Sequence, residues 1–403
     1  MPYELLWFLL PVAAASGWWT AQRQQRRSKR RQQRFVPSDY YKGINYFLNE
    51  QPDKAIDVFI RMLEVDSETV EPHLALGNLF RRRGEVDRAI RIHQNLVARP
   101  TLDKEQRNQA LLELGHDYMQ AGLFDRAENL LEELVERDSK NLPALRLLLT
   151  IYEQENEWHN AITVARKIEA NSTQRLRHIV AQYYCEQAAE NIAAAEFAEA
   201  RKLLRRSLTQ HPGCGRALIL QAEMDDRNDS YRGVIKSCRR VLQLNPEYLS
   251  DVFVIMSRAY EQLGRSPDLE SLVESLISEQ AAIHPVLLYT DYLIETRPDA
   301  ALVFLHRYLN IHPSLQGLQR LLLLLDKPEH SQPENAIDCR TSSLAVVSNL
   351  LENTPLYICN NCGFSSLKRH WQCPGCRSWE TVVAVTGYVP GREINSNNGI
   401  VKA

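Results

Sequence analysis

A short pattern recurs along most of this chain at intervals of 32 to 39 residues. In its clearest copies, which begin at Gly43, Gly77 and Gly115, an aromatic residue follows three residues after the glycine and an alanine twelve residues after it. Weaker copies keep the last position, which is occupied along the chain by Ala55, Ala89, Ala127, Ala161, Ala200, Val234, Leu269 and Ala301. A period of this length indicates one supersecondary unit repeated in series, because a single unit is too small to bury its own apolar face.

The residue types at the repeated positions predict pairs of antiparallel helices. Small residues let two helices approach closely, the aromatic residue fills the space between them, and a proline ends the second helix. The period is typical of the tetratricopeptide repeat. We therefore expect an all-α solenoid of about eight helix pairs over residues 36–325, with an extended concave surface. The longer intervals place "TLDKEQ" and "NSTQ" in loops, where insertions cost little.

A concave surface of this kind binds polypeptides. The first helices of the second and third units place Asn78, Arg81, Arg82 and His116 on it as candidate partner-binding residues. The arginines suit a carboxylate or an acidic segment. The alternative is that they form a solvated helix end, where cations complement the helix dipole. The chain has no phosphate-binding glycine loop, no H-E-x-x-H motif and no nucleophile elbow, so we expect a binding protein and not an enzyme.

The first 35 residues differ in composition from the rest. Residues 5–22 carry no charge, and a helix of that length spans about 27 Å, close to the thickness of a bilayer's hydrocarbon core. Seven basic residues follow within residues 23–34. By the positive-inside rule, we expect residues 1–22 to be a transmembrane anchor with its N-terminus outside. Residues 23–35 are then a basic linker beside the membrane, and the bulk of the chain lies inside.

Two other interpretations of this segment stay open. A cleaved signal peptide needs basic residues before the apolar run, and only Glu4 is charged there. A buried helix is the other alternative. The basic run could also be taken for a nucleic-acid patch, but beside an apolar span it favours a topogenic role at anionic lipid headgroups, so we expect no nucleic-acid partner.

Four of the eight cysteines form two C-x-x-C pairs near the C-terminus. They are Cys359, Cys362, Cys373 and Cys376. Ten residues separate the pairs, and β-forming residues flank them. Paired C-x-x-C turns supply four thiolates to one tetrahedral ion, either iron or zinc, in preference to free thiols or disulfides. His370 is the competing ligand nearby. The other cysteines are scattered, which favours buried thiols in a reducing compartment.

The cysteine pairs define a small module over residues 355–390, after a linker at residues 326–354 with one short helix, "LAVVSNLLEN". Residues 391–403 are expected to be a flexible tail. The module is too small for a self-sufficient core, so metal binding must supply much of its folding free energy. We expect its aromatic side chains to cover a small sheet, in preference to forming a stacking platform for bases. Its basic side chains offset the charge of the metal centre or, as the alternative, meet a partner. The aromatic residues are Phe364, Trp371 and Trp379, and the basic residues are Lys368, Arg369 and Arg377.

The chain resembles the lipopolysaccharide assembly protein B family of Gram-negative bacteria. The resemblance lies in "LLWFLLPVAAASGWW" near the N-terminus, in the repeats "LGNLFRRRGEVDRAIRIHQNL" and "LGHDYMQAGLFDRAE", and in "CNNCGF" and "WQCPGCRSW" near the C-terminus. It covers nearly the whole chain but is weaker over residues 171–327 and after Pro390. It implies a rubredoxin-type module whose four cysteines are the metal ligands. Rubredoxins usually have glycine after the second pair, where this chain has Arg377, which counts against electron transfer but not against metal binding.

The resemblance also implies a function and partners. Family members are single-pass proteins of the cell inner membrane, with a periplasmic N-terminus and a cytoplasmic bulk. They act as adaptors that promote degradation of the lipid A pathway deacetylase by a membrane-anchored ATP-dependent metalloprotease, and an inner-membrane signalling protein opposes them. Two alternatives remain, namely a scaffold for envelope-synthesis proteins and a rubredoxin-like electron carrier. A homo-oligomer is also left open.

Overall fold

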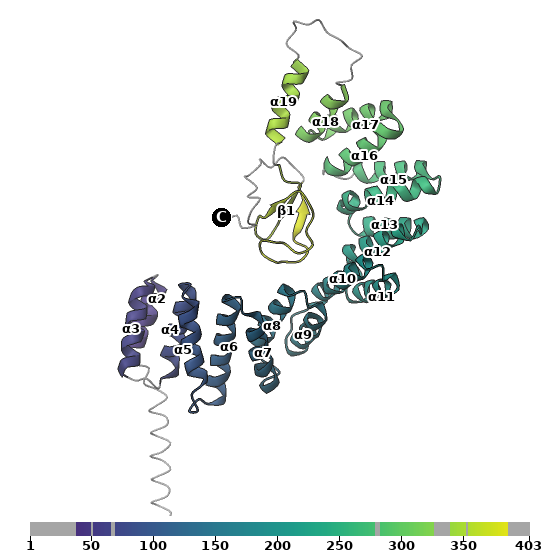
Figure 1. Cartoon of the computed structure of the whole chain (residues 1–403). Helices are drawn as coiled ribbons and strands as arrows, with labels where there is room; N and C mark the ends of the chain where they lie inside the picture. The colour runs from purple at the N-terminus through teal and green to yellow at the C-terminus, as the bar shows by residue number, and fades with distance from the viewer. Residues whose placement is uncertain are drawn as a thin grey trace, which may run out of the picture. The chain divides into compact units, whose positions relative to one another are not determined.

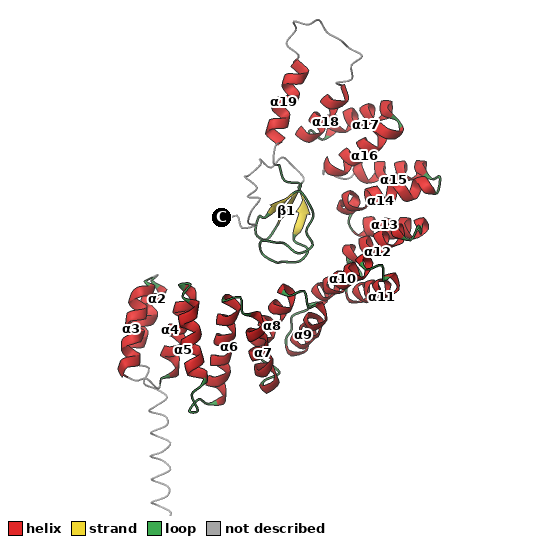
Figure 2. Cartoon of the chain, in the orientation of Figure 1, coloured by secondary structure: helices red, strands yellow, loops and turns green. Residues whose placement is uncertain are grey.

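The computed structural model describes residues 38–49, 51–65, 69–278, 283–325, 339–351 and 354–385. These residues are mostly helical, and a small three-stranded sheet lies near the C-terminal end (Figure 1, Figure 2). The chain divides into two compact units, Met1–Ser172 and Thr173–Ala403, which are called unit 1 and unit 2 below.

The described part of unit 1 consists of four consecutive helix pairs. In each pair the first helix is called the A helix and the second the B helix. The pairs are α2 (Ser38–Leu48) with α3 (Pro52–Val65), α4 (Val70–Arg82) with α5 (Val86–Val97), α6 (Lys104–Gln120) with α7 (Phe124–Arg137), and α8 (Leu142–Gln154) with α9 (Trp158–Asn171).

Unit 2 continues with four more pairs over its described residues. These are α10 (Arg177–Ala193) with α11 (Phe197–Gln210), α12 (Gly215–Arg227) with α13 (Tyr231–Leu244), α14 (Leu249–Gln262) with α15 (Ser266–Ser278), and α16 (Ile283–Thr296) with α17 (Pro298–Ile311). A short 3-10 helix, η2 (Pro246–Tyr248), precedes α14. After the pairs come α18 (Leu315–Leu325), α19 (Cys339–Leu351), β1 (Tyr357–Cys359), β2 (Ser365–Ser366) and β3 (Val382–Ala384).

The repeated small position lies on the B helix of every pair and is fully buried. All eight residues at this position have an exposed fraction of 0%: Ala55, Ala89, Ala127, Ala161, Ala200, Val234, Leu269 and Ala301. The repeated glycine lies on the A helix and faces the B helix. A Cβ added at Gly43 would come within 2.7 Å of the Phe59 ring, and one added at Gly115 within 2.9 Å of Leu131. The predicted helix-pair array is therefore confirmed, and close helix contact is the reason for its glycines.

Gly77→Ala is expected to destabilise unit 1 by about 1–3 kcal/mol through overpacking. The added carbon would lie 2.3 Å from the His93 ring, which is fully buried. Thermal unfolding of the full chain, followed by circular dichroism, measures the effect. Gly213→Ala is the matched control, because its added carbon would meet nothing closer than 3.4 Å. Equal unfolding midpoints for the two variants would contradict the close packing of α4 on α5.

Two helix starts differ from the sequence-based expectation. The α6 helix begins at Lys104, inside the stretch expected to be a loop. A capping box explains this start, because the Gln106 backbone N–H donates to the Asp103 side chain at 2.8 Å and the Asp103 N–H donates back to the Gln106 side chain at 3.3 Å. The α19 helix begins at Cys339 and not at Leu344. The "NSTQ" stretch begins at Asn171, the last residue of α9, and its other three residues lie between helices, as expected.

Within the part of the chain that the structure describes, no helix has the length and apolar character that crossing a membrane requires. The expected anchor at residues 1–22, the basic linker at residues 23–35 and the tail at residues 391–403 lie outside the described residues.

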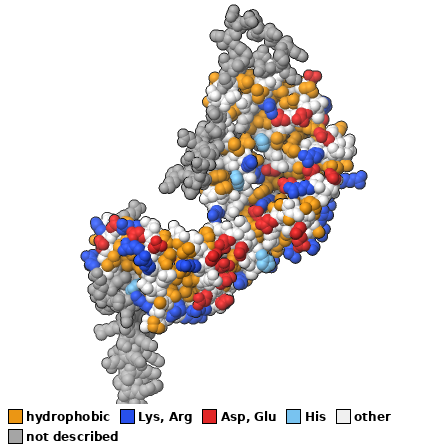
Figure 3. All heavy atoms as spheres, in the orientation of Figure 1, with side chains coloured by type: hydrophobic (Ala, Val, Ile, Leu, Met, Phe, Trp, Pro, Cys, Tyr) orange, Lys and Arg blue, Asp and Glu red, His pale blue; other side chains and the backbone are white. Residues whose placement is uncertain are grey.

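Side chains of both charges are interspersed with apolar ones on the face shown in Figure 3. Exposed pairs such as Arg137 with Glu133 and Lys202 with Glu199 join neighbouring turns of one helix. Pairs of this kind contribute little to stability, because water and salt screen the charges. Stability in this chain therefore depends mainly on the buried contacts between helices.

Candidate metal centre

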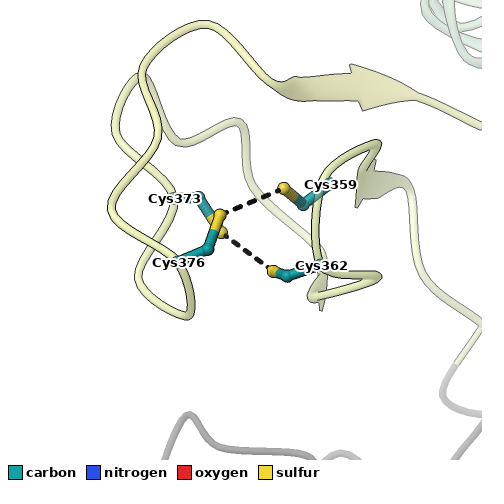
Figure 4. A group of neighbouring side chains, drawn as sticks. All are labelled: Cys359, Cys362, Cys373 and Cys376. Atoms are coloured by element: carbon teal, nitrogen blue, oxygen red, sulfur yellow. Dashed lines mark hydrogen bonds between the residues drawn. The ribbon is translucent and has the colours of Figure 1, made fainter. Parts of the chain in front are cut away.

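Four cysteine sulfurs meet in the small module that follows α19 (Figure 4). The Sγ atoms of Cys359, Cys362, Cys373 and Cys376 all lie within 4.8 Å of one another. Cys359 Sγ is 3.7 Å from Cys376 Sγ, and Cys362 Sγ is 3.6 Å from Cys373 Sγ. A tetrahedral ion with metal–sulfur bonds of about 2.3 Å requires sulfurs about 3.8 Å apart. The cluster therefore fits one tetrahedral metal ion, and an all-sulfur donor set suits zinc or iron.

Tight turns bring the sulfurs together. The β1 strand lies between β2 and β3, is antiparallel to both, and ends at Cys359. Gly363 follows the first pair with a φ of +74°, a conformation that favours glycine. Gly375 lies inside the second pair, where an added Cβ would come within 3.3 Å of Cys362 Sγ. Arg377 occupies the position equivalent to Gly363 and has a φ of +56°.

Arg377→Gly is expected to stabilise the module by about 1 kcal/mol. A left-handed backbone costs a non-glycine residue roughly 1–2 kcal/mol, and the greater freedom of glycine in the unfolded chain offsets part of the gain. The chelator concentration that removes half of the bound metal is the measurement. Lys368→Gly, at an exposed position outside the left-handed region, serves as the control and should give no gain. An Arg377→Gly chain that loses metal more readily than the unaltered chain would show that no strain resides there.

Hydrogen-bond donors surround the sulfurs. The Asn361 backbone N–H lies 3.4 Å from Cys359 Sγ. A hydrogen bond from the Ser378 side chain lowers the pKa of Cys376 to about 6, whereas burial raises the pKa of Cys373 to about 12. Because a metal binds thiolates, metal binding at this cluster displaces a proton from Cys373.

His370 lies outside the sulfur cluster. Its Nε2 atom is 3.1 Å from Ser366 Oγ, and its ring meets Phe364 edge to face with 5.8 Å between the ring centroids. These contacts give the imidazole a structural role in the module. The four sulfurs therefore have no histidine competitor among the described residues.

Arg369 joins the module to α14 of the same unit. Its Nε atom lies 3.0–3.1 Å from both carboxylate oxygens of Asp251. Its guanidinium also lies 5.1 Å from the ring centroid of Tyr248 and 5.0 Å from that of Tyr357. The Arg369 and Asp251 side chains are only 9% and 16% exposed. Arg369 therefore pairs with a buried carboxylate of the helix array, and its expected role in offsetting the charge of the metal centre stays a prediction.

Two tryptophans of the module lie at the same contact. The Trp371 ring packs on Tyr248 in η2, and Trp379 meets Tyr183 on α10 edge to face, each with 5.9 Å between ring centroids. Gln182 on α10 donates to Glu380 of the module at 2.6 Å. The tryptophans thus belong to a core that the module shares with the helices. Sequence reasoning missed the helix side of this contact, because no local motif marks Gln182, Tyr248 or Asp251.

The four predicted partner-binding residues lie on α4 and α6 in unit 1. Arg81 is paired within its own chain, with Nη2 at 2.7 Å from Glu113 Oε2 and Nη1 at 2.7 Å from Asp117 Oδ1. Asp117 is fully buried and lies 2.5 Å from Nδ1 of the equally buried His93. The carboxylate partners of Arg81 are therefore intramolecular, and its side chain is only 18% exposed.

Asn78 and Arg82 lie together at a cavity of about 310 Å³, which α2, α3 and α4 line. The Arg82 guanidinium lies 4.6 Å from the centroid of the Phe47 ring. The rest of the lining is mainly apolar: Tyr40, Ile44, Phe47, Phe59, Glu71, Leu74, Ala75 and Leu79. His116 does not line this cavity. Burial and the nearby Arg81 lower the pKa of His116, so its imidazole is neutral at pH 7.

Comparisons with known proteins match both parts of the chain. The family model for the rubredoxin metal binding domain matches residues 357–384. Family models for the tetratricopeptide repeat match residues 73–107 and 112–175. The rubredoxin match contains all four clustered cysteines. The two repeat matches contain all four candidate partner-binding residues, three of them in α4 and His116 in α6.

Curated relatives match over nearly their whole length. Lipopolysaccharide assembly protein B of Escherichia coli strain K12 is 35% identical over 387 residues, which cover 95% of this chain and 98% of that protein. The protein of the same name from Haemophilus influenzae is 34% identical over 397 residues, again covering 95% of this chain and 98% of the relative. The similarity therefore includes the helix array and the metal module together.

Proposed function

Because the chain belongs to the lipopolysaccharide assembly protein B family, we propose that it is an inner-membrane adaptor that controls lipopolysaccharide synthesis. In this proposal it promotes degradation of the lipid A pathway deacetylase by a membrane-anchored ATP-dependent metalloprotease. An inner-membrane signalling protein opposes it. The observation that carries the proposal is the extent of the relationship, since 35% identity over 95% of the chain includes both the repeats and the metal module.

The anchor serves to concentrate the adaptor beside its protease. Residues 1–22 cross the membrane in this proposal, with the N-terminus in the periplasm and the helix array in the cytoplasm. Tethering two proteins to one membrane raises the effective concentration of each for the other. A chain without residues 1–22, expressed at the native level, should therefore promote degradation poorly. Full activity of that chain would remove the anchor from the proposal.

The helix array supplies the partner-binding surface. The cavity that α2, α3 and α4 line has an apolar interior, with Asn78 and Arg82 among its polar residues. This combination suits a peptide that carries an apolar anchor beside an acidic residue. Arg81 and His116 lie outside this cavity but belong to the partner-binding surface of the helix array in this proposal. Glu113 and Asp117 hold the Arg81 side chain in place.

The four clustered cysteines hold one metal ion, iron or zinc, in this proposal. Protein sulfurs fill all four positions of a tetrahedral ion, which leaves no open position for a substrate. The ion therefore folds the module and does not carry out a reaction. The folded module then packs on α10, η2 and α14 through Trp379, Trp371 and Arg369.

The test is the half-life of the deacetylase after translation is stopped. Cells carry either the unaltered chain or a chain with Cys359→Ser and Cys362→Ser, at matched protein levels. A longer half-life in the mutant cells is the expected result. Arg377→Gly keeps all four thiols and is the control, with an unchanged half-life. If depletion of the whole chain leaves the half-life unchanged, the adaptor proposal fails and a scaffold for envelope-synthesis proteins replaces it.

A further inference from the structure

Two thiols lie together in unit 2, outside the metal cluster. Cys185 on α10 and Cys214, the residue before α12, are both fully buried. Their Sγ atoms are 3.8 Å apart. A disulfide bond of about 2.0 Å requires a further approach of the two sulfurs, and α10 packs against α12, which Cys214 directly precedes.

The two sulfurs have different hydrogen-bond partners. Ser207 Oγ donates to the Ala181 carbonyl oxygen at 2.9 Å and lies 3.3 Å from Cys185 Sγ. Gln182 Nε2 donates to Cys214 Sγ at 3.5 Å. The hydrogen bond between the cysteines lowers the pKa of Cys214 to about 7 and raises the pKa of Cys185. Cys214 is therefore the more acidic thiol of the pair and the one that ionises first.

The metal module contacts two residues that lie next to Cys214 and Gly215, namely Gln182 and Tyr248. The Gln182 nitrogen that donates to Cys214 Sγ also donates to Glu380 of the module at 2.6 Å. A carbon added at Gly215, which follows this cysteine, would lie 2.6 Å from the Tyr248 ring, and Trp371 of the module packs on that same ring. The module therefore lies against Gln182 and Tyr248, two residues that adjoin Cys214 and Gly215. A buried thiol is inert because oxidants do not reach it.

We propose that Cys185 and Cys214 are a modification site, which hydrogen peroxide oxidises to a disulfide when the module leaves its contact with α10, η2 and α14. The Cys214 thiolate attacks one peroxide oxygen, the O–O bond breaks, and hydroxide leaves behind a sulfenic acid. That hydroxide takes the proton of Cys185, and the Cys185 sulfur then displaces hydroxide from the sulfenic acid to form the S–S bond. The two sulfurs lose two electrons, and one peroxide becomes water and hydroxide. Cellular thiols reduce the bond again.

The test compares the unaltered, metal-loaded full chain with the variant Arg369→Ala/Trp371→Ala. This variant keeps all four clustered thiols and lacks two contacts between the module and the helices. Each protein is treated with hydrogen peroxide, free thiols are alkylated, and the linked Cys185–Cys214 peptide is quantified by mass spectrometry over time. The disulfide should form at least about tenfold faster in the variant, because local opening limits access to a buried group.

Two further variants keep the result interpretable. Glu380→Ala removes only the hydrogen bond from Gln182 to the module, so it should accelerate disulfide formation less than the double variant does. It provides a second comparison with the unaltered chain if the double variant does not fold. Cys214→Ser should abolish the linked peptide in every background. Absence of the linked peptide from all chains would overturn the proposal that the pair is a modification site. Equal rates in the unaltered chain and both contact variants would overturn the proposal that the module protects it.

Discussion

Cys373→Ser is expected to unfold the metal module and to leave the helices of unit 1 folded. Cys373 is fully buried and supplies one of the four sulfurs of the cluster. Structural zinc contributes about 10–16 kcal/mol to the folding of small modules, and a three-sulfur site loses most of this. The core of the module cannot replace that contribution, because its cluster of buried residues consists of Tyr357, Cys359, Cys373 and Val382, and two of these are metal ligands themselves. Metal content per chain and limited proteolysis within residues 355–385 measure the loss.

Cys238→Ser is the matched control for this experiment. Cys238 is also fully buried, but it lies on α13 in the helix array. Its replacement places a hydroxyl in an apolar core without touching the cluster, and should leave the metal content and the protease resistance of the module unchanged. A Cys373→Ser chain with a full complement of metal and an intact module would mean that the four sulfurs do not form one site.

Arg369→Ala is expected to release the module from the helices while the metal stays bound. The change leaves Asp251 buried without its cation, and breaking a buried ion pair costs about 3–5 kcal/mol. Hydrogen–deuterium exchange should increase at η2, at the start of α14 and in β3, but not in α4 to α7. Arg265→Ala is the control, since Arg265 and Asp268 form an exposed pair that contributes about 0.5 kcal/mol or less.

The effect of Arg369→Ala should depend on pH. Burial raises the pKa of Asp251 above its usual range. A raised pKa in the folded state means that folding favours the neutral carboxyl, so the penalty for the unpaired charge is present above that pKa and disappears as the pH falls through it. Asp251→Asn combined with Arg369→Ala should therefore cost less than Arg369→Ala alone. If the two changes instead add independently, the contact does not depend on this ion pair.

The helix array and the sulfur cluster were both predictable from local sequence. One buried position recurs in every repeat and is alanine in most of them, because each B helix passes close to its A helix; the eight residues from Ala55 to Ala301 at this position are fully buried. Each C-x-x-C pair lies within one turn, so spacing alone brings its two sulfurs together. Gly363 and Gly375 follow from the same turns, because a side chain at either position would strain the backbone or crowd a sulfur.

Other features were visible only in the tertiary structure. Arg81 was a candidate for binding a partner's carboxylate, yet the third repeat presents Glu113 and Asp117 to it. Arg369 meets Asp251, which lies 118 residues earlier in the chain. The thiols Cys185 and Cys214 occupy different repeats and share no motif.

The physical reason for this difference is how far apart in the sequence the contacting residues lie. Periodicity and cysteine spacing reflect contacts within one turn or one helix pair, so the sequence by itself determined the repeated helix pairs and the meeting of the four sulfurs. A contact between the module and α14 depends on how successive pairs stack, because small rotations between neighbouring pairs accumulate along the array. The spacing of residues within one repeat does not record these accumulated rotations. Only the tertiary structure therefore decided what Arg369 binds and which residue of α10 Glu380 contacts.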